Sequence, residues 1–158
     1  MSIEERDATA METRPAPPPL TGGCLCGAVR YEITAEPVVS CHCHCSLCRR
    51  ASGAPFATWT TVPLDGFRWT RGTPARFRSS EKAARDFCSA CGTQLTFRLE
   101  AQADGGQATL DVTSASLDAP DRIAPTAHIW LSSRVAWDVL PDDGLERFDE
   151  GFPPGRFG

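Results

Sequence analysis

The 158-residue chain lacks the features of a membrane protein or a nucleic-acid-binding protein. No run approaches the about 18 apolar residues that a membrane-spanning helix needs. Residues 1–14 are charged and lack the apolar core of a secretory signal. Acidic residues outnumber basic ones by 20 to 16, so a basic surface for binding phosphates is not expected. We therefore expect a cytoplasmic protein that binds neither membranes nor nucleic acid.

The sequence also lacks a long stretch with the 3.6-residue period of an amphipathic helix. The one helical turn that we expect runs from Ser46 to Ala51, and Gly53 ends it. Short β-forming segments separated by Gly and Pro turns dominate instead. The predicted strands lie within residues 29–33, 56–62, 67–69, 75–77, 93–99, 110–113 and 127–131. The pattern predicts an all-β fold.

Composition divides the chain into three parts. Residues 1–19 are charged and then rich in proline, which predicts a disordered tail. Residues 20–150 carry the strands and the cysteines, and they are long enough to form one domain with its own core. Residues 151–158 contain Phe-Pro-Pro-Gly and are expected to be irregular.

Cysteine is abundant, and its spacing is the main functional signal. The chain has 8 cysteines. They fall into three groups: Cys24 and Cys26; Cys41, Cys43, Cys45 and Cys48; and Cys88 and Cys91. Thiols stay reduced in the cytoplasm, where short cysteine spacings indicate metal ligands more often than disulfides.

The two outer groups suit one closed zinc site. The sequence Cys88-x-x-Cys91-Gly92 has the form of a zinc knuckle, in which glycine allows a tight backbone approach. Cys24 and Cys26 lie two residues apart, so their side chains share a face on a strand. The four thiolates together would form a tetrahedral site that contributes to folding. Four unrelated buried thiols are the alternative.

The middle group can form a site of a different kind. If residues 41–45 are extended, Cys41, Cys43 and Cys45 share one face. The spacing Cys45-x-x-Cys48 brings the last thiol back through the helical turn, so Cys43, Cys45 and Cys48 can converge on one ion. Three protein ligands with one open position are typical of catalytic zinc. These three cysteines are therefore the candidate catalytic residues.

Other residues leave the second site open to alternatives. Cys41 could be a fourth ligand that closes the site, an idle thiol or a redox-sensitive thiol. His42 and His44 could be ligands, but on a strand they face away from the cysteines and would hydrogen-bond locally. His128 could act as a general base, although a structural histidine with satisfied hydrogen bonds is the preferred interpretation.

Arginines supply candidate contacts to an anionic substrate. Arg49 and Arg50 directly follow Cys48 and could bind a carboxylate, although a solvated helix face would carry the same residues. The stretch from Arg68 to Arg85 is locally basic, and we interpret it as a solvated sheet surface. Arg49 and Arg50 are therefore the candidate substrate-binding residues.

Three segments in this order resemble the glutathione-dependent formaldehyde-activating enzyme (GFA) family: Gly22–Tyr31, Cys43–Gly53 and Phe87–Thr93. His128, Trp130 and Trp137 resemble the C-terminal strands of that family, so the similarity runs from about Leu20 to Pro153. The resemblance implies a β-tent fold, in which small antiparallel sheets surround zinc.

The resemblance also implies an activity, that of a zinc-dependent carbon–sulfur lyase that forms or cleaves S-hydroxymethylglutathione. By match to the family motif, the structural zinc ligands are Cys24, Cys26, Cys88 and Cys91. The ligands of a second, catalytic zinc are Cys43, Cys45 and Cys48. Cys41 lies outside that pattern. The expected cofactor is zinc, as two ions, and the expected partner is a small thiol such as glutathione. The alternatives are a non-catalytic zinc module that binds a protein, or a thiol redox sensor.

Overall fold

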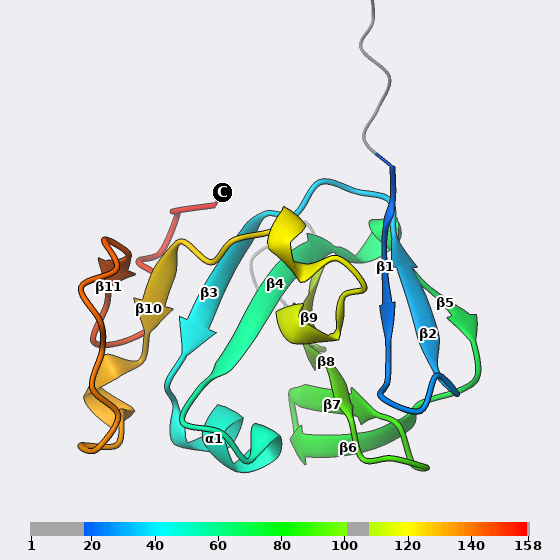
Figure 1. The fold of residues 1–158 in the computed structure, drawn as a ribbon, viewed down its shortest axis with the longest axis horizontal. Helices are drawn as coiled ribbons and strands as arrows, with labels where there is room; N and C mark the ends of the chain where they lie inside the picture. The colour runs from blue at the N-terminus through cyan, green and yellow to red at the C-terminus, as the bar shows by residue number, and fades with distance from the viewer. Residues whose placement is uncertain (1–17, 101–107, 158) are drawn as a thin grey trace, which may run out of the picture.

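The computed structural model describes residues 18–100 and 108–157, which form two β-sheets and one short α-helix (Figure 1). The smaller sheet is antiparallel, with the order β1-β2-β5. Its strands are β1 (Leu20–Gly23), β2 (Arg30–Ile33) and β5 (Phe67–Arg71). The helix α1 (Ser46–Ser52) lies at the lower edge of the view, below β3 and β4.

The larger sheet has eight strands among the described residues, in the order β11-β10-β3-β4-β9-β8-β7-β6. Their bounds are β11 (Glu146–Arg147), β10 (Ala127–Ile129), β3 (Val39–Cys43), β4 (Ala57–Pro63), β9 (Thr109–Thr113), β8 (Gln94–Leu99), β7 (Ala83–Phe87) and β6 (Ala75–Ser80). Strand β10 runs parallel to both of its neighbours, and the other pairs are antiparallel. The all-β prediction with one short helix is confirmed.

Two buried clusters divide the interior. The first joins β2 of the smaller sheet to the larger sheet and includes Tyr31, Leu95 and Val62. The second includes Trp59 and the cysteines of the middle group. Val62 and Trp59 both lie on β4, three residues apart, so strand alternation points them to opposite faces. The larger sheet therefore separates the main core from the cluster that holds the middle cysteines.

Two predicted segments end earlier than expected. The segment 127–131 forms a strand only to Ile129, because Trp130 takes a left-handed conformation with φ 60° and a 3₁₀ turn follows it. Strand β3 ends at Cys43, so residues 41–45 are not extended throughout. Three strands were not predicted. Two glycines hide the pattern of β1, charged residues hide that of β7, and β11 has only two residues.

The termini bear on the predicted domain boundaries. Most of the expected N-terminal tail, residues 1–17, lies outside the described residues, as do 101–107 and 158. Pro18 and Pro19 are held by Arg122, which donates to their carbonyl oxygens at 2.6 and 3.2 Å. Residues 151–157 form turns without helix or strand. No helix in the described part of the chain is long and apolar enough to cross a membrane.

Candidate metal and active site

The first cysteine cluster joins two loops that belong to different sheets. Cys24 and Cys26 lie between β1 and β2, and Cys88 and Cys91 lie between β7 and β8. The four Sγ atoms all lie within 4.8 Å of one another. Tetrahedral zinc with bonds of about 2.3 Å to sulfur places two ligand sulfurs about 3.8 Å apart. The Cys24–Cys26 and Cys26–Cys88 sulfur distances are 3.5 and 3.7 Å, which fit that spacing.

Glycine allows both loops to turn tightly around these sulfurs. Gly27 and Gly92 each have φ 76°, a left-handed conformation that favours glycine. Their amides donate to the carbonyl oxygens of Cys24 and Cys88 at 3.0 and 2.8 Å. The two cysteine pairs thus sit in equivalent turns, each closed by the glycine that follows its second cysteine.

Hydrogen bonds in the first cluster favour the thiolate forms of Cys24 and Cys91. The Thr93 hydroxyl lies 3.2 Å from Cys91 Sγ, and this contact together with nearby backbone N–H groups lowers the pKa of Cys91 to about 5. The Val29 amide donates to Cys24 Sγ at 3.2 Å. All 8 cysteines are free thiols, so none is consumed in a disulfide. The donor set and spacing therefore fit one structural zinc ion.

The second cluster contains three cysteines from a strand, a loop and the helix. Cys43 is the last residue of β3, Cys45 precedes α1 and Cys48 lies within α1. Their Sγ atoms lie within 4.8 Å of one another. Cys43 and Cys48 are buried, whereas Cys45 is partly exposed. Solvent therefore reaches this cluster beside Cys45.

The helix that completes the second cluster begins and ends at recognisable caps. Cys45 is the N-cap, and its Sγ accepts a hydrogen bond from the Cys48 amide at 3.3 Å. Gly53 is the C-cap in a left-handed conformation with φ 68°, and its amide donates to the Arg49 carbonyl. The predicted helical turn and its glycine stop are confirmed. One of the three candidate ligands is thus also the residue that starts the helix.

The three thiols of the second cluster share their protons unequally. Hydrogen bonds from Cys43 and Cys48, supported by backbone N–H groups, lower the pKa of Cys45 far below that of an ordinary thiol. Cys43 donates to Cys45, and this raises the pKa of Cys43. Sulfurs this close cannot all ionise without a cation between them. The arrangement fits a zinc ion bound by three thiolates.

Cys41 is close to the second cluster but is not part of it. The group of three mutually close sulfurs does not include Cys41. Its side chain is 4% exposed and packs in the same buried cluster, opposite Trp59 in the strand register. Burial raises the pKa of the Cys41 thiol to about 12. These features describe a protonated core thiol.

The histidines bind one another and nearby side chains. His42 Nδ1 lies 2.8 Å from the Thr58 hydroxyl, as expected for a histidine that hydrogen-bonds locally. His44 Nε2 lies 2.9 Å from His128 Nδ1, and His128 Nε2 lies 2.9 Å from Asp143 Oδ2. His44 and His128 are buried, so they do not face a solvent-accessible site.

Proton counting explains the weakest link in this chain of four side chains. Asp138, His44, His128 and Asp143 are joined by three links, but two neutral imidazoles supply only two N–H groups. The link between His44 Nδ1 and Asp138 Oδ2 is the longest, at 3.5 Å. Neither atom has a hydrogen-bond partner in the described part of the chain. Burial lowers the pKa of His44 to about 4, consistent with a neutral His44 ring.

Arg49 and Arg50 occupy different environments. Arg49 Nη1 donates to the carbonyl oxygens of His44 and Ser133 at 3.3 and 2.6 Å. Arg50 is exposed. Both arginines and Trp137 line a hollow of about 230 Å³ beside the helix that carries Cys48. Trp137 is 72% exposed, so its indole is open to a ligand.

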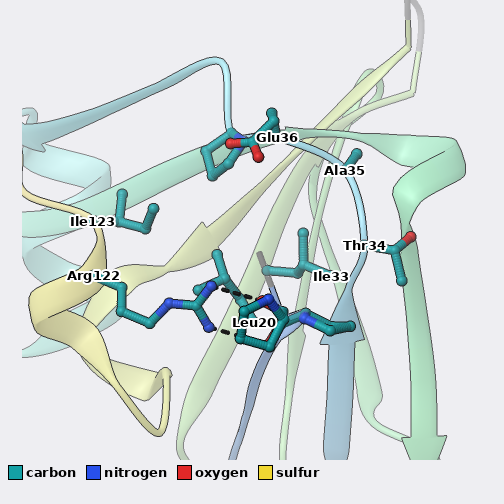
Figure 2. A pocket seen from close by; sticks show the side chains of 10 residues that line it. Leu20, Ile33, Thr34, Ala35, Glu36, Arg122 and Ile123 are labelled. Carbon is teal, nitrogen blue, oxygen red and sulfur yellow. Dashed lines mark hydrogen bonds between the residues drawn. The ribbon is translucent and has the colours of Figure 1, made fainter. Parts of the chain in front are cut away.

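A second hollow, of about 290 Å³, is lined by none of the cysteines. Its lining includes Leu20, Ile33 and Glu36, and Figure 2 shows Arg122 reaching across it to its hydrogen-bond acceptors. Glu36 supplies the one carboxylate of this lining, and neither of the two cysteine groups that could hold a metal ion lies there. The candidate active site is therefore the second cysteine cluster.

The sequence did not indicate two buried residues beside this cluster. Trp59 Nε1 donates to Cys48 Sγ at 3.4 Å. Arg85 is 7% exposed and lies over the rings of Trp59 and Phe97, so its interpretation as a solvated surface residue is wrong. One signal for the contact between Trp59 and Cys48 was available in the sequence: Trp59 lies in a predicted strand that could pair with the strand of the middle cysteines. No local pattern indicated that Arg85 would lie over the rings of Trp59 and Phe97.

Comparisons with known proteins agree with this arrangement. A family model described as glutathione-dependent formaldehyde-activating enzyme matches residues 19–133. An uncharacterised lyase of Schizosaccharomyces pombe is 36% identical over 81 residues, which cover 51% of this chain but only 58% of that protein. A crystal structure of a Rhodobacter sphaeroides protein matches with a TM-score of 0.51 and 24% identity, over 81% of this chain and 98% of that chain. The last similarity shows a shared fold.

Proposed function

Because the chain belongs to the glutathione-dependent formaldehyde-activating enzyme family, we propose that it is a zinc-dependent carbon–sulfur lyase. The reaction adds a thiol such as glutathione to formaldehyde, or reverses that addition. The thiol loses its proton, a C–S bond forms at the carbonyl carbon, and the carbonyl oxygen gains a proton to give S-hydroxymethylglutathione. The lyase name of the Schizosaccharomyces pombe relative supports the reaction class.

The observation that carries this proposal is that the second cluster contains three converging sulfurs rather than four. Cys43, Cys45 and Cys48 would hold a zinc ion, which would supply a Lewis acid that lowers the pKa of a substrate thiol. Cys43 and Cys48 form the buried side of the site, and Cys45 lies at its solvent side. A substrate thiol therefore approaches past Cys45.

The first cluster has a structural role in this proposal. Cys24, Cys26, Cys88 and Cys91 supply four sulfurs, which leaves no position for a substrate on a tetrahedral ion. They join the smaller sheet to the β7–β8 loop, so a metal there stabilises the fold. Both sites need reduced thiols, which is why we also propose a cytoplasmic location.

Arg50 and Trp137 are the substrate contacts that the geometry favours. Glutathione carries two carboxylates, and a guanidinium can bind a carboxylate through two hydrogen bonds. The side chain of Arg50 lines the hollow beside α1, where the exposed indole of Trp137 forms another wall. Arg49 also lines the hollow, but it holds two backbone carbonyls and therefore shapes the site.

Exchange spectroscopy by NMR tests the activity directly. Zinc-loaded protein is added to glutathione and formaldehyde at equilibrium, and the exchange rate between free glutathione and its hydroxymethyl adduct is measured. We expect an increase that Cys45→Ser abolishes, whereas Cys41→Ala retains it. If the protein holds both zinc ions and the exchange rate is unchanged, the lyase proposal is wrong and the non-catalytic zinc module becomes the preferred function.

A further inference from the structure

The second cysteine cluster receives a hydrogen bond from a tryptophan on a neighbouring strand. Trp59 Nε1 lies 3.4 Å from Cys48 Sγ, and both side chains are buried, with exposures of 4% and 6%. An indole N–H can only donate, so the sulfur is the acceptor. The contact spans 11 residues and joins β4 to α1.

This donor differs from the backbone amides that reach sulfurs of the two clusters. Cys45 accepts from the amide of Cys48, three residues away, and Cys24 accepts from the amide of Val29, five residues away. Those bonds follow from the backbone turn that each cysteine occupies. The Trp59 bond depends on a side chain, so a substitution can remove it without changing the turn.

A buried cation lies over the same indole. The guanidinium carbon of Arg85 lies 6.0 Å from the Trp59 ring centroid and 4.7 Å from that of Phe97. Arg85 is buried and interacts electrostatically with Asp111, whose carboxylate accepts a hydrogen bond from Thr61 at 2.6 Å. A cation over the ring face attracts its electrons, which makes the indole N–H a stronger donor.

We propose that Trp59, held and polarised by Arg85, is a positioning residue that withdraws negative charge from Cys48. Three thiolates and one Zn²⁺ carry a net charge of about −1, and an added substrate thiolate makes it about −2. Hydrogen bonding to one ligand sulfur offsets part of this charge, so the open position accepts an anionic thiol more readily. The inference rests on the proposed zinc site, but not on the identity of the electrophile.

The conservative variant Trp59→Phe tests this proposal because it keeps an aromatic ring and removes the N–H. Two readouts are measured without glutathione or formaldehyde. In protein loaded with Co²⁺, we expect the sulfur-to-metal charge-transfer band to move to lower energy. In zinc-loaded protein, we expect iodoacetamide, which reaches the second cluster beside Cys45, to alkylate its sulfurs faster, by at most about fivefold, since one ordinary hydrogen bond corresponds to about that factor.

Trp69→Phe is the matched control, because Trp69 lies on β5 and packs against Tyr31 and Phe67. It should leave both readouts at their original values. Wild-type values of both readouts in folded Trp59→Phe would overturn the inference. If that variant does not fold, Arg85→Met replaces it, because it removes the cation over the indole. The same directions are expected, and unchanged values count against the proposal.

The outcomes separate this inference from the proposed activity. Shifts in both readouts, in a protein that does not accelerate the glutathione–formaldehyde exchange, support the role of Trp59 and exclude the lyase activity. Unchanged readouts in a protein that does accelerate the exchange exclude the role of Trp59 and support the lyase activity. A protein whose second cluster takes up neither Co²⁺ nor Zn²⁺ overturns both.

Discussion

The Nη1 atom of Arg49 lies 2.6 Å from the carbonyl oxygen of Ser133, and this contact ties the helix that carries Cys48 to a segment 84 residues further along the chain. The same atom lies 3.3 Å from the His44 carbonyl oxygen. Arg49 thus connects three parts of the second site, whereas its neighbour Arg50 is exposed and lines the hollow beside the helix.

The two arginines should therefore separate stability from substrate binding. Arg49→Met removes hydrogen bonds to two carbonyl groups, and we expect it to lower the free energy of unfolding by about 1–2 kcal/mol. Arg50→Met should leave stability unchanged and raise KM for glutathione about threefold to tenfold through loss of a carboxylate contact. Thermal denaturation and steady-state kinetics of both variants measure these effects. Equal effects of both variants on KM, with no difference in stability, would contradict this division.

The sequence spacing predicted which cysteines lie together within each pair, because the members of a pair are close in sequence, whereas the meeting of the first pair with Cys88 and Cys91 depends on the fold. Cys88-x-x-Cys91 and Cys45-x-x-Cys48 each place two sulfurs together within a single turn, whatever the rest of the fold does. The grouping of Cys43, Cys45 and Cys48 survived even though β3 ends at Cys43, since the cap and helix bring the last two sulfurs back. Local geometry thus determined most of the candidate site.

The remaining parts depend on the register of distant strands. Arg85 belongs to a basic stretch, and only the pairing of β7 with β8 places its guanidinium over Phe97. His44 and His128 are 84 residues apart and meet because β10 pairs in parallel with β3. Strand alternation assigns a residue to a face but does not say which strand lies beside it.

Removing ligands should distinguish the two clusters. We expect wild-type protein to hold about two zinc ions per chain, one per cluster. Cys45→Ser should lose the second ion while the fold remains, because the first cluster still joins the two sheets. Cys91→Ser should lose the first ion and melt at a much lower temperature, since a structural zinc contributes to folding. Elemental analysis and circular dichroism provide the measurements, and loss of fold in Cys45→Ser but not in Cys91→Ser would reverse the assignment.

Tyr31 should give the folded protein a distinct alkaline pH dependence. Its phenol is buried and lies 2.7 Å from the Ser116 hydroxyl, and burial raises its pKa from 10.0 to about 12. Between pH 10 and 12 the unfolded chain loses the phenol proton first. The free energy of unfolding therefore falls by about 1.4 kcal/mol per pH unit over this range. Below pH 10 the phenol contributes no slope.

Tyr31→Phe provides the comparison, because the cysteines titrate in both proteins. At pH 8 the variant should be about 1 kcal/mol less stable, through loss of the hydrogen bond to Ser116. As pH rises toward 12, the wild type should lose this advantage and become the less stable of the two. Urea denaturation at several pH values tests the crossing, and parallel curves for the two proteins would show that the phenol is not shielded.

Cys41 decides whether the second site is open, and the structure leads us to expect that it is not a ligand. Its thiol is buried, its pKa is raised to about 12, and its sulfur is outside the group formed by Cys43, Cys45 and Cys48. Cys41→Ala should therefore retain two zinc ions and the exchange activity, with a loss of about 1 kcal/mol in stability from the smaller side chain. Cys43→Ala is the matched control on the same strand and should lose one ion. Loss of one ion in Cys41→Ala as well would mean a site closed by four thiolates, at which a substrate thiol could bind only by displacing a ligand.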